Sequence, residues 1–85
     1  MPMKYVMLKL EGGELLPVIF PEFFQHSHVA QAIPATVVSA GRVSLEGGRI
    51  IASEASTSLG VSSREEDGEI IQAYFEGQNV IQQER

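Results

Sequence analysis

Two Leu-Glu-Gly-Gly segments, at residues 10–13 and 45–48, constrain the fold of this chain more than any other feature. Each lies between two short apolar runs, and paired glycines readily take the positive φ angles of a two-residue hairpin turn. The sequence therefore predicts four strands joined as two hairpins, at residues 5–10 with 15–20 and at residues 36–45 with 50–55. The two segments are either halves of a ββα repeat or two separate uses of a common turn.

Two residues inside these strands carry positional information. Pro17 has no N–H for a strand ladder, which predicts that its strand lies at a sheet edge or that its nitrogen faces solvent. Gly41 interrupts a run of larger side chains, and a glycine inside a strand indicates a bulge or a close approach of another backbone.

A helix is predicted after each hairpin. Ser27 is a candidate N-cap for a short helix at residues 28–33. Ser63 and Glu66 have the spacing of a capping box for a second helix, and Gly77 lies where that helix would end. The predicted fold is α+β: a four-stranded antiparallel sheet with two helices on one face, in ββαββα order.

Length and charge limit the organisation and the partners of the chain. Its 85 residues predict one domain, residues 1–85, with a tail at 78–85 that is frayed or in an oligomer contact. A core this small favours a homo-oligomer. The net charge of -5 and six scattered basic residues argue against nucleic-acid binding, and a basic protein surface is the better electrostatic match.

The chain also lacks the marks of a membrane or secreted protein. No apolar run approaches the roughly 20 residues that a membrane span needs, and the N-terminus lacks the apolar segment of a signal peptide. There is no cysteine, hence no disulfide. We therefore expect a cytoplasmic protein that contacts no membrane.

A hydroxyl-rich segment before the second helix is the candidate ligand site. Hydroxyls, backbone N–H groups at a helix start and one guanidinium suit a phosphate or carboxylate. The alternative is a polar connector that ends in a helix cap, with the arginine paired to a neighbouring carboxylate. The candidate ligand-binding residues are Ser56, Thr57, Ser58, Gly60, Ser62, Ser63 and Arg64.

Aromatic and acidic side chains form the candidate partner-binding surface. Phe23 and Phe24 follow Phe20 and Pro21, and these aromatic residues either plug the core or anchor an interface. Three acidic residues stand at the start of the second helix, where they either complement the helix dipole or occupy a basic groove of a partner. These residues are Glu65, Glu66 and Asp67.

Catalysis, metal and cofactor binding find no support in the sequence. There is neither a Gly-x-Ser-x-Gly elbow nor a cysteine nucleophile. His26 and His28 lie two residues apart, whereas a helical metal site places two histidines four apart. We expect no enzyme activity, no metal and no cofactor.

Three segments carry a resemblance to a known class of proteins. They are Pro-Glu-Phe-Phe at residues 21–24, Val-Ser-Ala-Gly at 38–41 and Ser-Leu-Gly-Val-Ser-Ser-Arg-Glu-Glu-Asp-Gly-Glu-Ile-Ile at 58–71. In these segments the chain resembles small open reading frames of unknown activity in phages and prophages. The resemblance implies an accessory factor that binds and blocks a host component.

Three functions are therefore expected as alternatives. The first is a small acidic, non-enzymatic interaction protein, such as an inhibitor of a host defence or regulatory component. The second is an oligomeric protein that binds or sequesters a small anionic ligand such as a nucleotide. The third is a structural subunit of an assembly.

Overall fold

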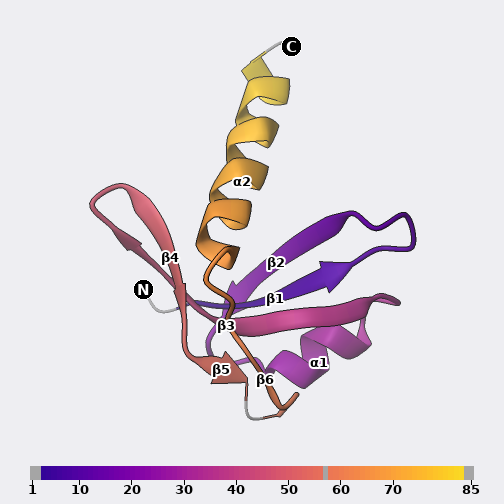
Figure 1. Cartoon of the computed structure of the whole chain (residues 1–85). Coiled ribbons are helices and arrows are strands. Elements are labelled where there is room, and N and C mark those ends of the chain that lie inside the picture. Colours follow the sequence, from indigo (N-terminus) through magenta and orange to yellow (C-terminus); the bar gives the residue numbers. More distant parts are fainter. Residues whose placement is uncertain (1–2, 57, 84–85) are drawn as a thin grey trace.

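The computed structural model has an α+β fold built on one four-stranded antiparallel sheet (Figure 1). It describes residues 3–56 and 58–83, the last six of these as helical backbone only. The elements are β1 (Met3–Lys9), β2 (Leu15–Pro21), α1 (His26–Gln31), β3 (Thr36–Glu46), β4 (Arg49–Ser53), β5 (Ala55–Ser56), β6 (Val61–Ser62) and α2 (Asp67–Gln83). The sheet has the order β2-β1-β3-β4, and β5 pairs with β6 separately. The predicted class and the ββαββα order are confirmed, with the β5–β6 pair inserted before α2.

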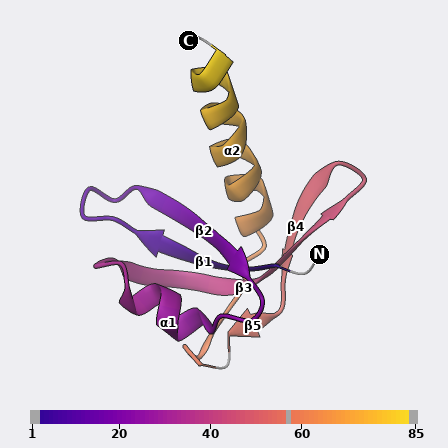
Figure 2. The same ribbon diagram turned by 180° about the vertical axis from the view of Figure 1, so that it is seen from behind.

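The two helices cover opposite faces of the sheet (Figures 1 and 2). On β1, four consecutive residues, 5–8, are fully buried. Because side chains alternate between the faces of a strand, this central strand is apolar on both sides, and each side needs a cover. Val6 and Leu8 pack toward α1 and the β5–β6 segment, whereas Tyr5 and Met7 pack with Ile71 of α2. The prediction that both helices lie on one face is therefore wrong.

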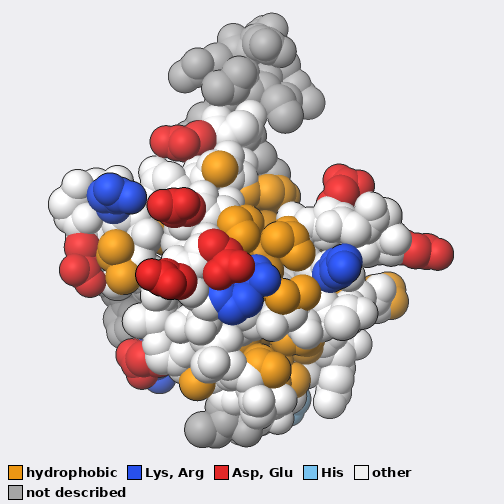
Figure 3. Space-filling model, viewed as in Figure 1, with side chains coloured by type: hydrophobic (Ala, Val, Ile, Leu, Met, Phe, Trp, Pro, Cys, Tyr) orange, Lys and Arg blue, Asp and Glu red, His pale blue; other side chains and the backbone are white. Residues whose placement is uncertain are grey.

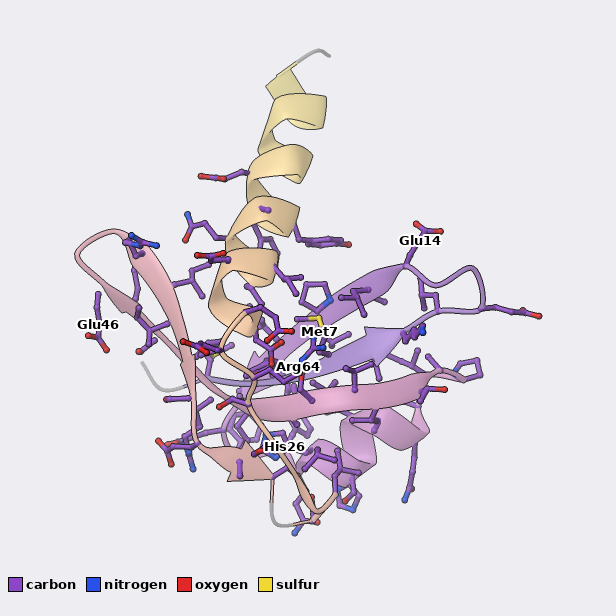
Figure 4. The ribbon with its side chains drawn as sticks, viewed as in Figure 1. Met7, Glu14, His26, Glu46 and Arg64 are labelled. Carbon is purple, nitrogen blue, oxygen red and sulfur yellow. The ribbon has the colours of Figure 1, made fainter. Side chains whose placement is uncertain are left out.

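The two Gly-Gly segments form different turns. In the second, Gly47 and Gly48 both have positive φ between the paired residues Glu46 and Arg49, which is the predicted two-residue turn. In the first, only Gly13 of the glycine pair has positive φ. The Leu10 N–H donates to the Glu14 carbonyl, and the Leu10 carbonyl accepts a bond from the Gly13 N–H. That loop is one residue longer, a type I turn with a glycine bulge. The outer ends of the hairpins, marked by Glu14 and Glu46, lie far apart (Figure 4).

Both edges of the sheet are blocked against a further strand. Hydrogen-bonded pairs alternate along an antiparallel ladder, and the Leu10 N–H bonds the Glu14 carbonyl. From this register the nitrogens of residues 15, 17, 19 and 21 face outward on β2, and two of these residues are prolines. On β4 the outward Ile50 N–H donates to the Gln72 side chain of α2, at 3.0 Å. The edge position predicted from Pro17 is confirmed.

Two glycines permit close backbone contacts. A Cβ on Gly41 would lie 2.3 Å from the Ser53 carbonyl oxygen, and a Cβ on Gly68 would lie 2.8 Å from the Ile50 carbonyl oxygen. Real Cβ atoms do not approach backbone oxygen so closely, so each position needs a glycine. The close approach predicted at Gly41 is confirmed, and Gly68 lets the start of α2 lie against β4.

The predicted helix ends need correction. The first helix starts at His26 with Gln25 as a cap that makes no side-chain bond, so Ser27 lies inside the helix. The second continues through Gly77 to Gln83, because one exposed glycine only weakens a helix. Residues 84–85 of the predicted tail lie outside the described part, as do the side chains of 78–83.

Two alanine substitutions in α2 should have opposite effects on stability. Gly68→Ala should lower the free energy of unfolding by about 1–3 kcal/mol, because its methyl group would overpack against β4. Gly77→Ala should raise it by about 0.5–1 kcal/mol, because among the described residues the added Cβ would meet no atom within 4 Å outside the backbone of its own helix and alanine is the better helix former. Urea unfolding of both variants measures the difference. Equal stabilisation by the two substitutions would contradict the packing of α2 on β4.

Candidate functional site

The serine-rich segment folds back on itself as the β5–β6 pair. Ser56 is 2% exposed, and its Oγ accepts a hydrogen bond from the Leu59 N–H at 3.1 Å. The Gly60 N–H donates to the Ser56 carbonyl at 2.9 Å, and Gly60 has a φ of 70°. These bonds close a tight loop, in which the Ser56 hydroxyl serves the backbone of its own segment.

Of the other described hydroxyls in the segment, that of Ser58 lies within hydrogen-bond distance of Ser56, with the two Oγ atoms 3.3 Å apart. Ser58 is exposed, and its Oγ accepts a bond from the Ser27 N–H at 3.3 Å. Ser62 is also exposed, while the Ser63 N–H bonds the Glu54 carbonyl at 2.9 Å. Thr57 lies outside the described residues. A ligand at this segment remains a prediction.

Arg64 is directed at a carboxylate of its own chain. Its Nε donates to Oδ1 of Asp67 at 3.0 Å, and its Nη2 lies 2.9 Å from the same oxygen, as an ion pair without an aligned hydrogen bond. A second carboxylate, on Glu66, lies 3.7 Å from Nη1. This is the pairing that the connector alternative predicts. Arg64 lies where the base of α2 meets the sheet (Figure 4).

Asp67 is the centre of a buried polar cluster. Its side chain is fully buried, so its predicted place on an acidic surface is wrong. Oδ2 accepts bonds from Tyr5 Oη at 2.5 Å, Ser39 Oγ at 2.6 Å and the Arg64 backbone N–H at 3.0 Å. The last bond is the returning half of a capping box. Only this half of the box forms, and it joins Arg64 and Asp67 in place of the predicted Ser63 and Glu66.

The cluster keeps Asp67 charged although it is buried. Burial alone would raise the pKa of the carboxyl, but bonds from Ser39, Tyr5 and Arg64 outweigh it and lower the pKa below the ordinary 3.8. For Tyr5, burial is the largest cause of the pKa shift. Burial and the hydrogen bond to Asp67 together raise the pKa of the phenol far above its ordinary 10.0. Tyr5 therefore remains a hydrogen-bond donor over the physiological pH range.

Removing the Asp67 charge should destabilise the fold. Asp67→Asn should lower the free energy of unfolding at neutral pH by at least about 2 kcal/mol, because bonds to a charged acceptor are lost and Arg64 loses the nearer of its two carboxylate partners. Since the folded-state pKa of Asp67 is lowered, its contribution is present above 3.8 and disappears as pH falls through the folded-state value.

As the pH falls below 3.8, the wild type should therefore lose more of its free energy of unfolding than Asp67→Asn does. Urea unfolding across a pH series measures both effects. Glu69→Gln, an exposed change in the same helical turn, is the control and should behave like the wild type. An acid response equal in the wild type and Asp67→Asn would contradict this role.

A polar cleft lies between α1 and β5, on the sheet face opposite the one that α2 covers. Its volume is about 360 Å³. The lining residues are Lys4, Gln25, His26, Arg42, Glu54, Ala55 and Ser58. Residues from five parts of the chain meet here, including Ser58 of the predicted ligand-binding set.

The cleft is lined by two cations, Lys4 and Arg42, and by one carboxylate, Glu54. Arg42 pairs with Glu22 at 3.0 Å and lies 3.5 Å from Glu54. Lys4 donates from Nζ to the Phe24 carbonyl at 2.9 Å. His26 is buried, and its Nε2 donates to the Gly41 carbonyl at 2.8 Å. The cleft therefore offers both charged donors and charged acceptors, which suits the polar groups of a peptide better than a lone anion.

Glu54, at the rim of this cleft, has a strained backbone. It is the only described non-glycine residue with positive φ, at 65°, a conformation that costs a side-chain-bearing residue about 1–2 kcal/mol. Its carbonyl accepts the Ser63 N–H, and its carboxylate faces Arg42. The backbone of Gly41 lies close to the carbonyl groups of Ser53 and Glu54 at this point, where β4 bends into β5.

Two phenylalanines are exposed next to the cleft. Phe23 is 78% exposed and Phe24 is 46% exposed, and their ring centroids lie 4.7 Å apart. Phe20 is buried at 5% and packs edge-on to His26. The core-plug interpretation therefore holds for Phe20 alone. We call Phe23 and Phe24 the aromatic pair.

The other acidic candidates lie elsewhere. Glu65 and Glu66 are exposed at the start of α2, where acidic side chains gather around the lower part of the helix (Figure 3). Their sequence position predicted this exposure. The cleft was missed because Lys4, Arg42 and Glu54 are distant in sequence and meet only through strand order and the β4–β5 bend.

Comparison of this chain with protein-family models, with curated proteins and with solved structures finds no match. Within the described residues, no cluster of histidine and carboxylate side chains could hold a metal ion. Among the described helices, none is both long and apolar enough to cross a membrane.

Proposed function

We propose that this chain is a small non-enzymatic interaction protein that binds another protein through the aromatic pair and the polar cleft beside it. The exposure of Phe23 and Phe24 carries the proposal. A core this small gains stability from every large side chain it can bury. Two adjacent phenylalanines left on the surface are instead typical of interface anchors.

The aromatic pair is held in place before any partner binds. The Phe24 N–H bonds the Pro21 carbonyl at 3.2 Å, and Lys4 holds the Phe24 carbonyl. On the preceding residue, Glu22 is paired with Arg42. A preorganised anchor loses less conformational entropy on binding. The segment can therefore present both rings to an apolar pocket at low cost.

The chemistry of the surface defines the partner. Its apolar pocket would receive the aromatic rings, and its polar rim would exchange hydrogen bonds with the cleft. The net charge of -5 favours a basic partner surface and speeds association at low salt. Together with the resemblance to phage open reading frames, this supports a factor that occupies and blocks a site on a host protein.

A pull-down with paired variants tests the proposal. The tagged chain should retain a stoichiometric protein from a bacterial lysate at low salt. Phe23→Ser with Phe24→Ser should lose that protein, because both anchors are removed. Ile51→Ser, which changes another exposed apolar residue on β4 (39% exposed), is the control and should retain it. Absence of a stoichiometric partner, or retention by the double variant, would count against the proposed function.

A further inference from the structure

The sheet face that carries α2 is covered only in part. Ile70 and Ile71 of the helix pack on this face, yet apolar side chains remain exposed beside the helix on its β1–β2 side (Figure 3). On the β3–β4 hairpin, Leu45 is 72% exposed. Leu45 shares its face with Val43, two residues away on β3, and Val43 belongs to the core beneath α2.

Leu45 borders an uncharged hollow of about 260 Å³. The hollow is lined by Met3, Ile19, Val43, Ser44, Leu45 and Ile50. The chain as a whole carries a net charge of -5, and like net charge opposes association of two copies. This lining contains no charged side chain, and the charges of Arg42, Glu46 and Glu54 belong to an adjoining hollow that shares Leu45.

The exposed area of the chain is large for its mass. A compact monomer of 9.3 kDa exposes about 5000 Å² by the usual scaling of surface with mass. This chain exposes 5664 Å², roughly 700 Å² more. The part of α2 that extends beyond the sheet contributes to this excess (Figure 1), and so does the uncovered apolar face on which Leu45 is 72% exposed.

Association through the sheet edges is disfavoured. Pro17 and Pro21 remove two of the outward N–H groups of β2, and proline protects an edge against pairing. The outward N–H of Ile50 on β4 is already bonded to Gln72. Strand addition between copies is thereby blocked, and face-to-face packing of the uncovered surface remains.

We propose that two copies of this chain associate about a two-fold axis, with Leu45 of each copy packed into the hollow of the other. The same patch supplies both the protruding side chain and the hollow. It therefore meets the self-complementarity that a two-fold contact requires. The contact is separate from the aromatic pair, which lies on the β2–α1 connection, and does not depend on the proposed function.

Sedimentation equilibrium of the untagged full chain tests this dimer. The wild type should sediment at twice the 9.3 kDa chain mass as its concentration is raised from about 10 µM to 1 mM, the range in which a modest interface assembles. Leu45→Glu should sediment at the chain mass, because two carboxylates would enter the apolar contact. Ile51→Glu adds the same charge to the same hairpin. Ile51 pairs with Ser44, the neighbour of Leu45 on β3, so its side chain lies on the opposite face of the sheet from Leu45. This control should remain a dimer.

The outcomes separate clearly. Leu45 is exposed, so its replacement should cost little folding stability, and circular dichroism checks the fold of each variant. A monomeric wild type at the highest concentration would overturn the proposal, whatever the variants do. A dimeric Leu45→Glu would overturn it, and so would dissociation of Ile51→Glu, because either result places the contact elsewhere.

Discussion

The fold depends on keeping one buried carboxylate charged. Moving a carboxylate out of water costs several kcal/mol unless other groups replace the lost hydration. The Asp67 carboxylate instead accepts hydrogen bonds from Tyr5 of β1 and Ser39 of β3. It also accepts bonds from the backbone N–H and the guanidinium of Arg64. The first residue of α2 is thereby joined to the two central strands. Ile70 and Ile71 pack the helix on the sheet, and this polar junction adds a fixed point at the residue where the helix starts.

The junction also explains the two-sided core. With α2 anchored above Tyr5 and Met7, the opposite face of β1 is left to α1 and the β5–β6 segment. The glycines at 41 and 68 make this arrangement possible, since each allows backbone to pass where a Cβ would collide. Apolar packing and polar bonds thus have different roles. Close packing places α2 against β4, and the hydrogen bonds of Asp67 fix the orientation of the helix.

Local patterns in the sequence predicted the elements well. Alternating apolar residues, the Gly-Gly turns and Pro17 identified the strands, one hairpin turn and the edge position of β2. Some failures were local, at the helix ends and at the first Gly-Gly turn. The others needed contacts between distant segments. The sequence placed Asp67 among exposed acidic residues, and nothing within its own segment indicates that Tyr5 and Ser39 meet it. The sequence identified the candidate ligand segment by its polar residues. Its guanidinium group, on Arg64, is paired with Asp67 in the structure. Phe23 and Phe24 could equally have completed a core, and only the tertiary structure shows them exposed.

A carboxyl NMR titration of the isotope-labelled protein tests the central claim most directly, because it follows the Asp67 side chain itself. A charged, fully hydrogen-bonded Asp67 should titrate below the ordinary aspartate pKa of 3.8, and the Ser39→Ala substitution should raise its pKa by removing one donor. A midpoint at or above 3.8 in the folded wild type would show that burial outweighs the hydrogen bonds, and it would contradict the account of a charged junction between α2 and the sheet.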